Sequence, residues 1–119
     1  MTMRLKPPLE HDEQCAVVRW WQHQLPRVRL FAIPNGGHRH KAVAAKLKAE
    51  GVDSGVPDLF APEWRLWVEM KRRGGRKPDP EQLDWHAYLR GCGYIVLVAY
   101  GASDAIAQIT AFAKERGFL

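Results

Sequence analysis

Apolar and polar positions follow two different periods in the first half of the chain. Over residues 10–24 the apolar positions recur every three or four residues and Pro26 follows, which predicts a helix. Residues 28–33 alternate and are rich in β-formers, and turn residues at 34–37 follow, so a strand is expected. Helical composition returns over residues 38–50. The predicted order here is helix, strand, helix.

The second half of the chain predicts two strands close together, then a helix, a strand and a last helix. The expected segments are strands at 56–61 and 64–71 around a turn at 62–65, a helix opened by Asp79 and Pro80 with Leu83, Trp85, Ala87 and Leu89 on its buried side, a strand at 94–99, and a helix capped by Ser103. The full order, α-β-α-β-β-α-β-α, predicts an α/β fold with a central mixed β-sheet flanked by helices, in one domain over residues 1–119.

Charged residues lie at the two open ends of the expected hairpin strands. Pro57-Asp58 opens the first strand, and Glu69-Met70-Lys71 ends the second after ten intervening residues. Because side chains alternate along a strand, Trp67, Glu69 and Lys71 are expected on one face, opposite the apolar face. The hairpin would bring Asp58 alongside Glu69, so two carboxylates and a lysine would meet.

Two carboxylates beside a lysine suit a divalent-metal phosphodiesterase site. Magnesium prefers oxygen ligands, and Asp58, Glu69 and the backbone carbonyl of Met70 are the expected donors. The cation would polarise a phosphate and activate water, while Lys71 would orient that water or offset developing charge. A surface hairpin with solvated charges is the alternative for such a short pattern.

An excess of positive charge favours a polyanionic partner. The net charge is +5 and the isoelectric point is near 9.5. The residues expected to contact DNA lie in two basic segments: Arg39, Lys41, Arg72, Arg73, Arg76 and Lys77. For the segment from Arg72 to Lys77, a charged loop that only keeps the protein in solution is the alternative.

Other classes of protein are disfavoured by composition. Two cysteines are too few for a disulfide framework or a four-ligand zinc site. There is no apolar run of the roughly 20 residues that a membrane span needs, and the N-terminus lacks the apolar core of a signal peptide, so no membrane partner and a cytoplasmic location are expected.

The chain resembles the PD-(D/E)XK nuclease superfamily and, within it, the stand-alone VRR-NUC domains of bacteriophages and bacteria. The motifs behind this resemblance, in order, are Glu10-His11-Asp12-Glu13-Gln14, Asn35-Gly36-Gly37, Gly55-Val56-Pro57-Asp58-Leu59, Glu69-Met70-Lys71 and Gln82. The resemblance implies a restriction-endonuclease-like core, with the metal site on Asp58 and Glu69 and with Lys71 beside the attacking water.

Two further site residues are implied by the resemblance. Gln82 matches the family's helix glutamine and would hold water or phosphate, but it could equally complete a capping box with Asp79. The family also places an acid in its first helix, where Glu10 is favoured because it shares a face with Gln14, and Glu13 stays open.

The expected function is a Mg²⁺- or Mn²⁺-dependent DNA endonuclease. The resemblance implies branched substrates such as Holliday junctions, a task that favours a homodimer. A non-catalytic DNA-binding accessory module, or a nuclease acting on flaps or RNA, is the alternative. The histidine pair at residues 38 and 40 lacks partners for a rival metal site, and His86 receives no role.

Overall fold

The computed structural model describes residues 8–34 and 41–119. Its elements are α1 (Glu10–Gln24), β1 (Phe31–Ala32), α2 (Lys41–Ala49), β2 (Leu59–Ala61), the 3-10 turn η1 (Pro62–Trp64), β3 (Leu66–Lys71), α3 (Pro80–Gly91), β4 (Ile95–Tyr100) and α4 (Ala102–Glu115). The predicted order of helices and strands is confirmed. The early strands are shorter than predicted.

The strand β2 starts at Leu59 rather than at residue 56 because the preceding segment bonds to itself. The Gly55 amide donates to Oδ1 of Asp53 at 2.9 Å, and Pro57 has no amide hydrogen to offer a neighbouring strand. These residues therefore form a turn that delivers the chain to the sheet at Asp58.

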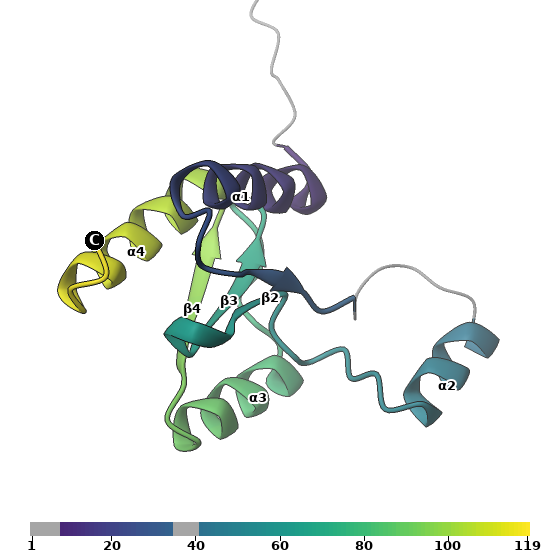
Figure 1. Cartoon of the computed structure of the whole chain (residues 1–119). Coiled ribbons are helices and arrows are strands. Elements are labelled where there is room, and N and C mark those ends of the chain that lie inside the picture. The colour runs from purple at the N-terminus through teal and green to yellow at the C-terminus, as the bar shows by residue number, and fades with distance from the viewer. Residues whose placement is uncertain (1–7, 35–40) are drawn as a thin grey trace, which may run out of the picture.

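The sheet contains four strands in the order β1-β2-β3-β4. The β1/β2 and β2/β3 pairs are antiparallel, whereas β3 and β4 are parallel and are connected through α3. Figure 1 shows the strands between α1 and α4 on one side and α3 on the other. The predicted mixed sheet flanked by helices is confirmed.

The main core lies between the sheet and the pair α1 and α4. Leu66, Val68 and Met70 of β3 are fully buried and belong to one cluster with Val17 and Trp21 of α1. The cluster continues through Ile109 and Phe112 of α4. The apolar face of β3 thus packs where its alternation predicted.

The predicted buried side of α3 is wrong in part. Leu83 is 52% exposed and Ala87 is also exposed, whereas His86 and Leu89 are buried. The reason is that α3 turns polar side chains, Gln82 and His86, towards polar residues of β3. An apolar stripe is not what orients this helix.

The predicted cap of α4 is also wrong. Gly101 is the N-cap, and Ser103 is an exposed residue within the helix. The amide of Ala102 donates instead to the Glu13 carboxylate at 2.8 Å, so a residue from α1 caps this helix. Gly101 has a φ of 93°, and an added Cβ would meet Glu13 and Arg73.

The helix α2 stands apart from the sheet in Figure 1, and none of its residues is buried. Its described part begins at Lys41, and the predicted start at residue 38 lies outside the described part of the chain. Of the helices that the structure describes, none has the length and apolar character to cross a membrane.

Candidate active site

The β2/β3 hairpin places Asp58 directly before its first strand. Leu59 pairs with Val68 and Ala61 with Leu66, so the same register continued by one residue sets Asp58 opposite Glu69. Oδ2 of Asp58 accepts a hydrogen bond of 2.7 Å from the Met70 amide, which fixes the Asp58 carboxylate against β3. Opposed residues of a hairpin share a face, so both carboxylates lie on the polar face of the sheet.

Glu69 is buried beneath α3, with only 2% of its surface exposed. Its Oε1 lies 3.2 Å from Nε2 of His86, a side chain that is itself 1% exposed. Burial, followed by the hydrogen bond and charge of Asp58, raises the pKa of Glu69 to about 9. Glu69 is therefore a carboxyl group whose ionised form needs compensation from a positive charge.

His86 was missed by the sequence analysis because no partner is visible near it in the chain. Burial lowers its pKa, and the positive charges of Arg90 and Lys71 act in the same direction. The His86–Glu69 contact is therefore a hydrogen bond of a neutral imidazole rather than an ion pair. The signal that could have revealed it is the spacing Gln82 to His86, which puts both on one face of α3.

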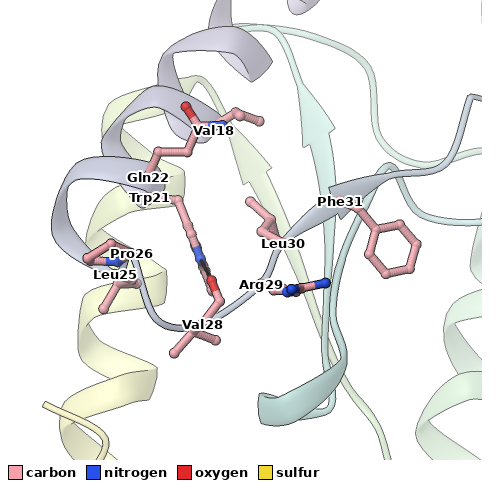
Figure 2. A pocket seen from close by; sticks show the side chains of 9 residues that line it. All are labelled: Val18, Trp21, Gln22, Leu25, Pro26, Val28, Arg29, Leu30 and Phe31. Atoms are coloured by element: carbon pink, nitrogen blue, oxygen red, sulfur yellow. Dashed lines mark hydrogen bonds between the residues drawn. The ribbon is translucent and has the colours of Figure 1, made fainter.

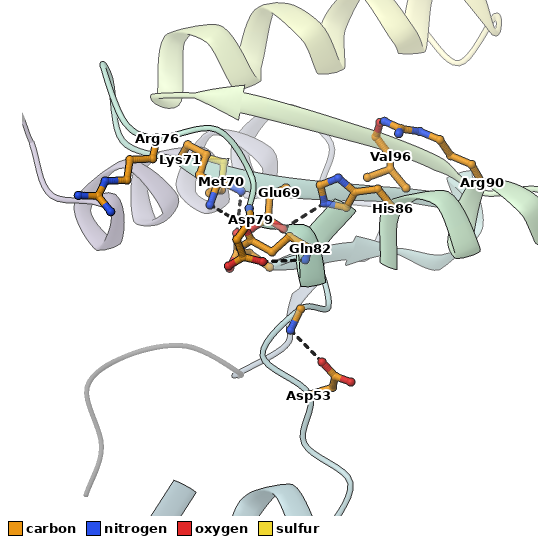
Figure 3. Close-up of polar contacts among 12 residues, drawn as sticks. Asp53, Glu69, Met70, Lys71, Arg76, Asp79, Gln82, His86, Arg90 and Val96 are labelled. Atoms are coloured by element: carbon orange, nitrogen blue, oxygen red, sulfur yellow. Dashed lines mark hydrogen bonds and ion pairs between the residues drawn. The ribbon is translucent and has the colours of Figure 1, made fainter. Parts of the chain in front are cut away.

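Gln82 forms the capping box that the sequence left open and also binds the lysine of the site. Asp79 Oδ1 accepts from the Gln82 amide at 2.9 Å and Gln82 Oε1 accepts from the Asp79 amide at 3.0 Å, which is a capping box. The same Oε1 accepts a 2.9 Å hydrogen bond from Nζ of Lys71. The start of α3 and the lysine of the site are thus held by one side chain (Figure 3).

The two glutamates of α1 have different surroundings. Partial burial and then the negative charge of Asp58 raise the pKa of Glu10, while the positive charge of Lys71 opposes the shift. Glu13 points elsewhere: it is 5% exposed, caps α4 through Ala102 and forms an ion pair of 3.4 Å with Arg73. Glu10 is therefore the glutamate of α1 that interacts with the charges of the site, whereas Glu13 has a structural role.

Gly55 of the Gly55-Val56-Pro57-Asp58-Leu59 motif lies against α3. A Cβ added to it would come within 2.7 Å of the Trp85 side chain and 2.8 Å of Glu81. Ser54 also donates to Glu81 at 3.2 Å, so this loop is attached to α3 just before it reaches Asp58. The glycine is needed for close approach and not for an unusual φ.

The donor set fits a hard divalent cation that keeps part of its solvent shell. Asp58 and Glu69 supply carboxylate oxygens from the two sides of the hairpin, and the register of β2 and β3 sets these residues opposite each other. In the described part of the chain no three acidic, histidine or cysteine side chains form a closed metal-binding group. Magnesium does not require one, because water and phosphate oxygens usually complete its octahedron.

The predicted DNA-contacting residues differ in exposure and in their contacts. Arg72, Arg76 and Lys77 are exposed, and Lys41 is the exposed first residue of α2. Arg73 is 60% exposed and bound to Glu13. Arg39, together with the motif Asn35-Gly36-Gly37 and the histidines at 38 and 40, lies outside the described residues.

A pocket of about 390 Å³ lies between the end of α1 and β1 (Figure 2). Its lining is mostly apolar and consists of Val18, Trp21, Gln22, Leu25, Pro26, Val28, Arg29, Leu30 and Phe31. It includes neither carboxylate of the hairpin nor Lys71. The acidic site is therefore separate from this pocket.

Comparison with models of known protein families finds no match to the chain, and comparison with curated proteins finds none either. A solved structure described as "VRR_NUC domain protein" is similar at 29% sequence identity, with a TM-score of 0.73. The match covers 92% of this chain and 92% of that one. The likeness is therefore one of the whole fold and not of a single motif.

Proposed function

We propose that this chain, which is similar over its whole fold to a VRR_NUC domain protein as the resemblance of its motifs predicted, is a divalent-metal-dependent endodeoxyribonuclease. The observation that carries the proposal is the meeting of Asp58 and Glu69 on one face of the hairpin, with Lys71 two residues further along the same face. A buried carboxylate such as that of Glu69 is costly for a fold unless a cation compensates its charge.

Asp58, Glu69 and the Met70 carbonyl are the groups that would hold Mg²⁺ or Mn²⁺. When bound there, such a cation polarises a phosphate and lowers the pKa of a coordinated water. Burial and the neighbouring carboxylate raise the pKa of Glu69, so a bound cation would stabilise the ionised form of this side chain.

The remaining side chains act on charge and orientation. The Lys71 ammonium, held by Gln82 at 2.9 Å, offers a fixed positive charge to the phosphate as negative charge develops on its oxygens. Glu10 adds a carboxylate near Lys71 and Asp58, where it can accept a hydrogen bond from the attacking water. Glu13 takes no part, since its oxygens are used by α4 and Arg73.

The substrate that we favour is branched DNA such as a Holliday junction, cut by a homodimer. Junctions present two strands at two-fold-related positions, and two copies of one site match that symmetry. Exposed Arg72, Arg76, Lys77 and Lys41 would contact phosphates on either side of the cut strand.

A non-catalytic DNA-binding module is the alternative. It would place three acids, Glu10, Asp58 and Glu69, beside phosphate with no chemical use, and these acids repel phosphate unless a cation is present. The preference for DNA over RNA rests on the family likeness.

The test is cleavage of a matched set of substrates. We would incubate the protein with a four-way junction, a flap, a duplex, a single strand and a matched RNA, each with Mg²⁺, with Mn²⁺ and with EDTA. We expect cation-dependent cutting with the junction preferred, and none by Asp58→Asn. Binding without cutting under every condition would favour the accessory module. Analytical ultracentrifugation would measure the oligomeric state with and without junction.

A further inference from the structure

A buried polar contact joins α3 to the proposed metal site. His86 and Glu69 are 1% and 2% exposed, and Nε2 of the imidazole lies 3.2 Å from Oε1 of the carboxyl group. Figure 3 shows the His86 ring reaching from α3 to the Glu69 side chain. Because neither side chain is accessible to solvent, water cannot replace either partner in this hydrogen bond.

The spacing of two contacts shows that α3 is set in register with β3. Gln82 and His86 are four residues apart on a helix, a separation of about 6 Å along the axis. Their partners Lys71 and Glu69 are two residues apart on a strand, a separation of about 6.6 Å. Because the separations match, one face of α3 reaches two adjacent side chains of the site at once.

The register continues beyond these pairs. Nη2 of Arg90, four residues after His86, donates to the Val96 carbonyl at 2.9 Å. Val96 is the cross-strand partner of Trp67, which is the next residue along the polar face of β3 after Glu69. The helix is thus fixed along its length, which leaves His86 little freedom to move away from Glu69.

Donor and acceptor roles follow from the chemistry of a metal ligand. An ionised carboxylate can only accept hydrogen bonds, so Nε2 of His86 must carry the hydrogen when Glu69 binds a cation. This bond occupies one oxygen, Oε1, and orients the carboxylate about its own axis. We infer that His86 is a positioning residue, which holds Glu69 through Oε1 so that its other oxygen faces the cation site beside Asp58.

The inference rests on the proposed function, because it needs Glu69 to be a metal ligand. Groups that hydrogen-bond a metal ligand from behind typically contribute 10–100-fold to metal affinity, so about tenfold or more is expected here. A purely structural His86 would affect stability alone.

The experiment is a calorimetric titration with Mn²⁺ alone, without nucleic acid. His86→Leu removes the donor at similar volume, and His86→Gln keeps an N–H at the position of Nε2. Leu89→Ala is the matched control, because Leu89 is 6% exposed on the same face of α3 and its aliphatic side chain cannot donate a hydrogen bond. Thermal unfolding of each variant would measure the stability lost.

We expect His86→Leu to weaken Mn²⁺ binding about tenfold or more, His86→Gln to remain within about threefold of wild type, and Leu89→Ala to lose stability with unchanged affinity. Wild-type affinity in His86→Leu would overturn the inference alone. Absence of Mn²⁺ binding by the wild-type protein would overturn the proposed function as well. If His86→Leu does not fold, a folded His86→Gln that has lost Mn²⁺ binding also overturns the inference.

Discussion

The two faces of β3 differ in chemistry and also in burial, since Trp67 and Lys71, which share a face with Glu69, are only half-buried. Leu66, Val68 and Met70 are fully buried against α1 and α4, and Glu69 is 2% exposed beneath α3. The apolar face gains free energy from the water it releases. The polar face holds a carboxyl group whose pKa burial raises to about 9, so its ionised form destabilises the fold.

The apolar face of β3 therefore stabilises the sheet, whereas the polar face carries the side chains of the proposed site. Both faces need a covering helix layer, but α1 and α4 supply apolar contacts whereas α3 supplies hydrogen bonds from Gln82 and His86. We expect substitutions on one face to change stability and substitutions on the other to change chemistry.

The largest effect is expected from Glu69→Gln on the polar face. The amide keeps the size of the side chain and removes the charge that a cation needs, so loss of several kcal/mol of catalysis should lower the cleavage rate at least about a thousandfold. The thermal unfolding temperature should not fall, because a buried ionisable group has been replaced by a neutral one. Single-turnover cleavage and calorimetry measure the two quantities, and wild-type cutting by this variant would remove Glu69 from the site.

Leu66→Ala on the apolar face should do the opposite. Removing a fully buried leucine side chain leaves a cavity and should lower the free energy of unfolding by about 2–5 kcal/mol. The cleavage rate per folded molecule, measured well below the unfolding temperature, should stay within about threefold of wild type. Urea denaturation gives the stability. A rate that falls with unchanged stability would contradict the division between the faces.

Gln82→Ala should show an intermediate effect on both quantities, because Gln82 serves the helix and the site. Loss of the capping box should cost about 1 kcal/mol of stability. Asp79→Ala is the matched control, since it removes the cap without touching Lys71 directly. We expect both variants to lose similar stability and only Gln82→Ala to lose cleavage rate, by about tenfold. Equal rates in the two variants would show that the Lys71–Gln82 bond has no catalytic use.

The smallest effect is expected from the arginines beyond β3. Arg72→Gln should lower the slope of log affinity against log salt by about 0.9 on duplex arms, because one fewer counterion is released. Arg73→Gln should lower it less, since Arg73 is already paired with Glu13. Fluorescence anisotropy over a range of salt concentrations measures both slopes, in Ca²⁺ to prevent cutting. A larger change for Arg73 would show that DNA displaces the ion pair.

Local patterns predicted the hairpin well. Ten residues separate Asp58 from Glu69, and the observed register sets them opposite each other because hairpin pairing depends on the turn and on alternation within a few residues. The same reasoning placed Leu66, Val68 and Met70 on the core face. These relations are decided within a segment of the chain, so they can be read from it.

Relations across the fold could not be predicted in the same way. Glu10 and Glu13 differ in sequence by one helical turn, but only the packing of α1 on α4 shows that Glu13 is used as a cap and Glu10 is left near Asp58. His86 lay on a helix with no visible partner, and the apolar Leu83 was expected on a buried side that α3 turns to solvent. The contacts that decide these outcomes join residues at least 11 positions apart.

The chain's own order of residues determined which elements form, where the β2/β3 hairpin turns, and that an aspartate, a glutamate and a lysine share one strand face. Tertiary structure alone decided which glutamate of α1 joins them, which residue caps α4, and that His86 touches Glu69. The physical reason is the distance along the chain over which the interactions act. Periodicity and turn chemistry act between neighbours, whereas the partners of a buried polar group are set by whichever helix packs over it.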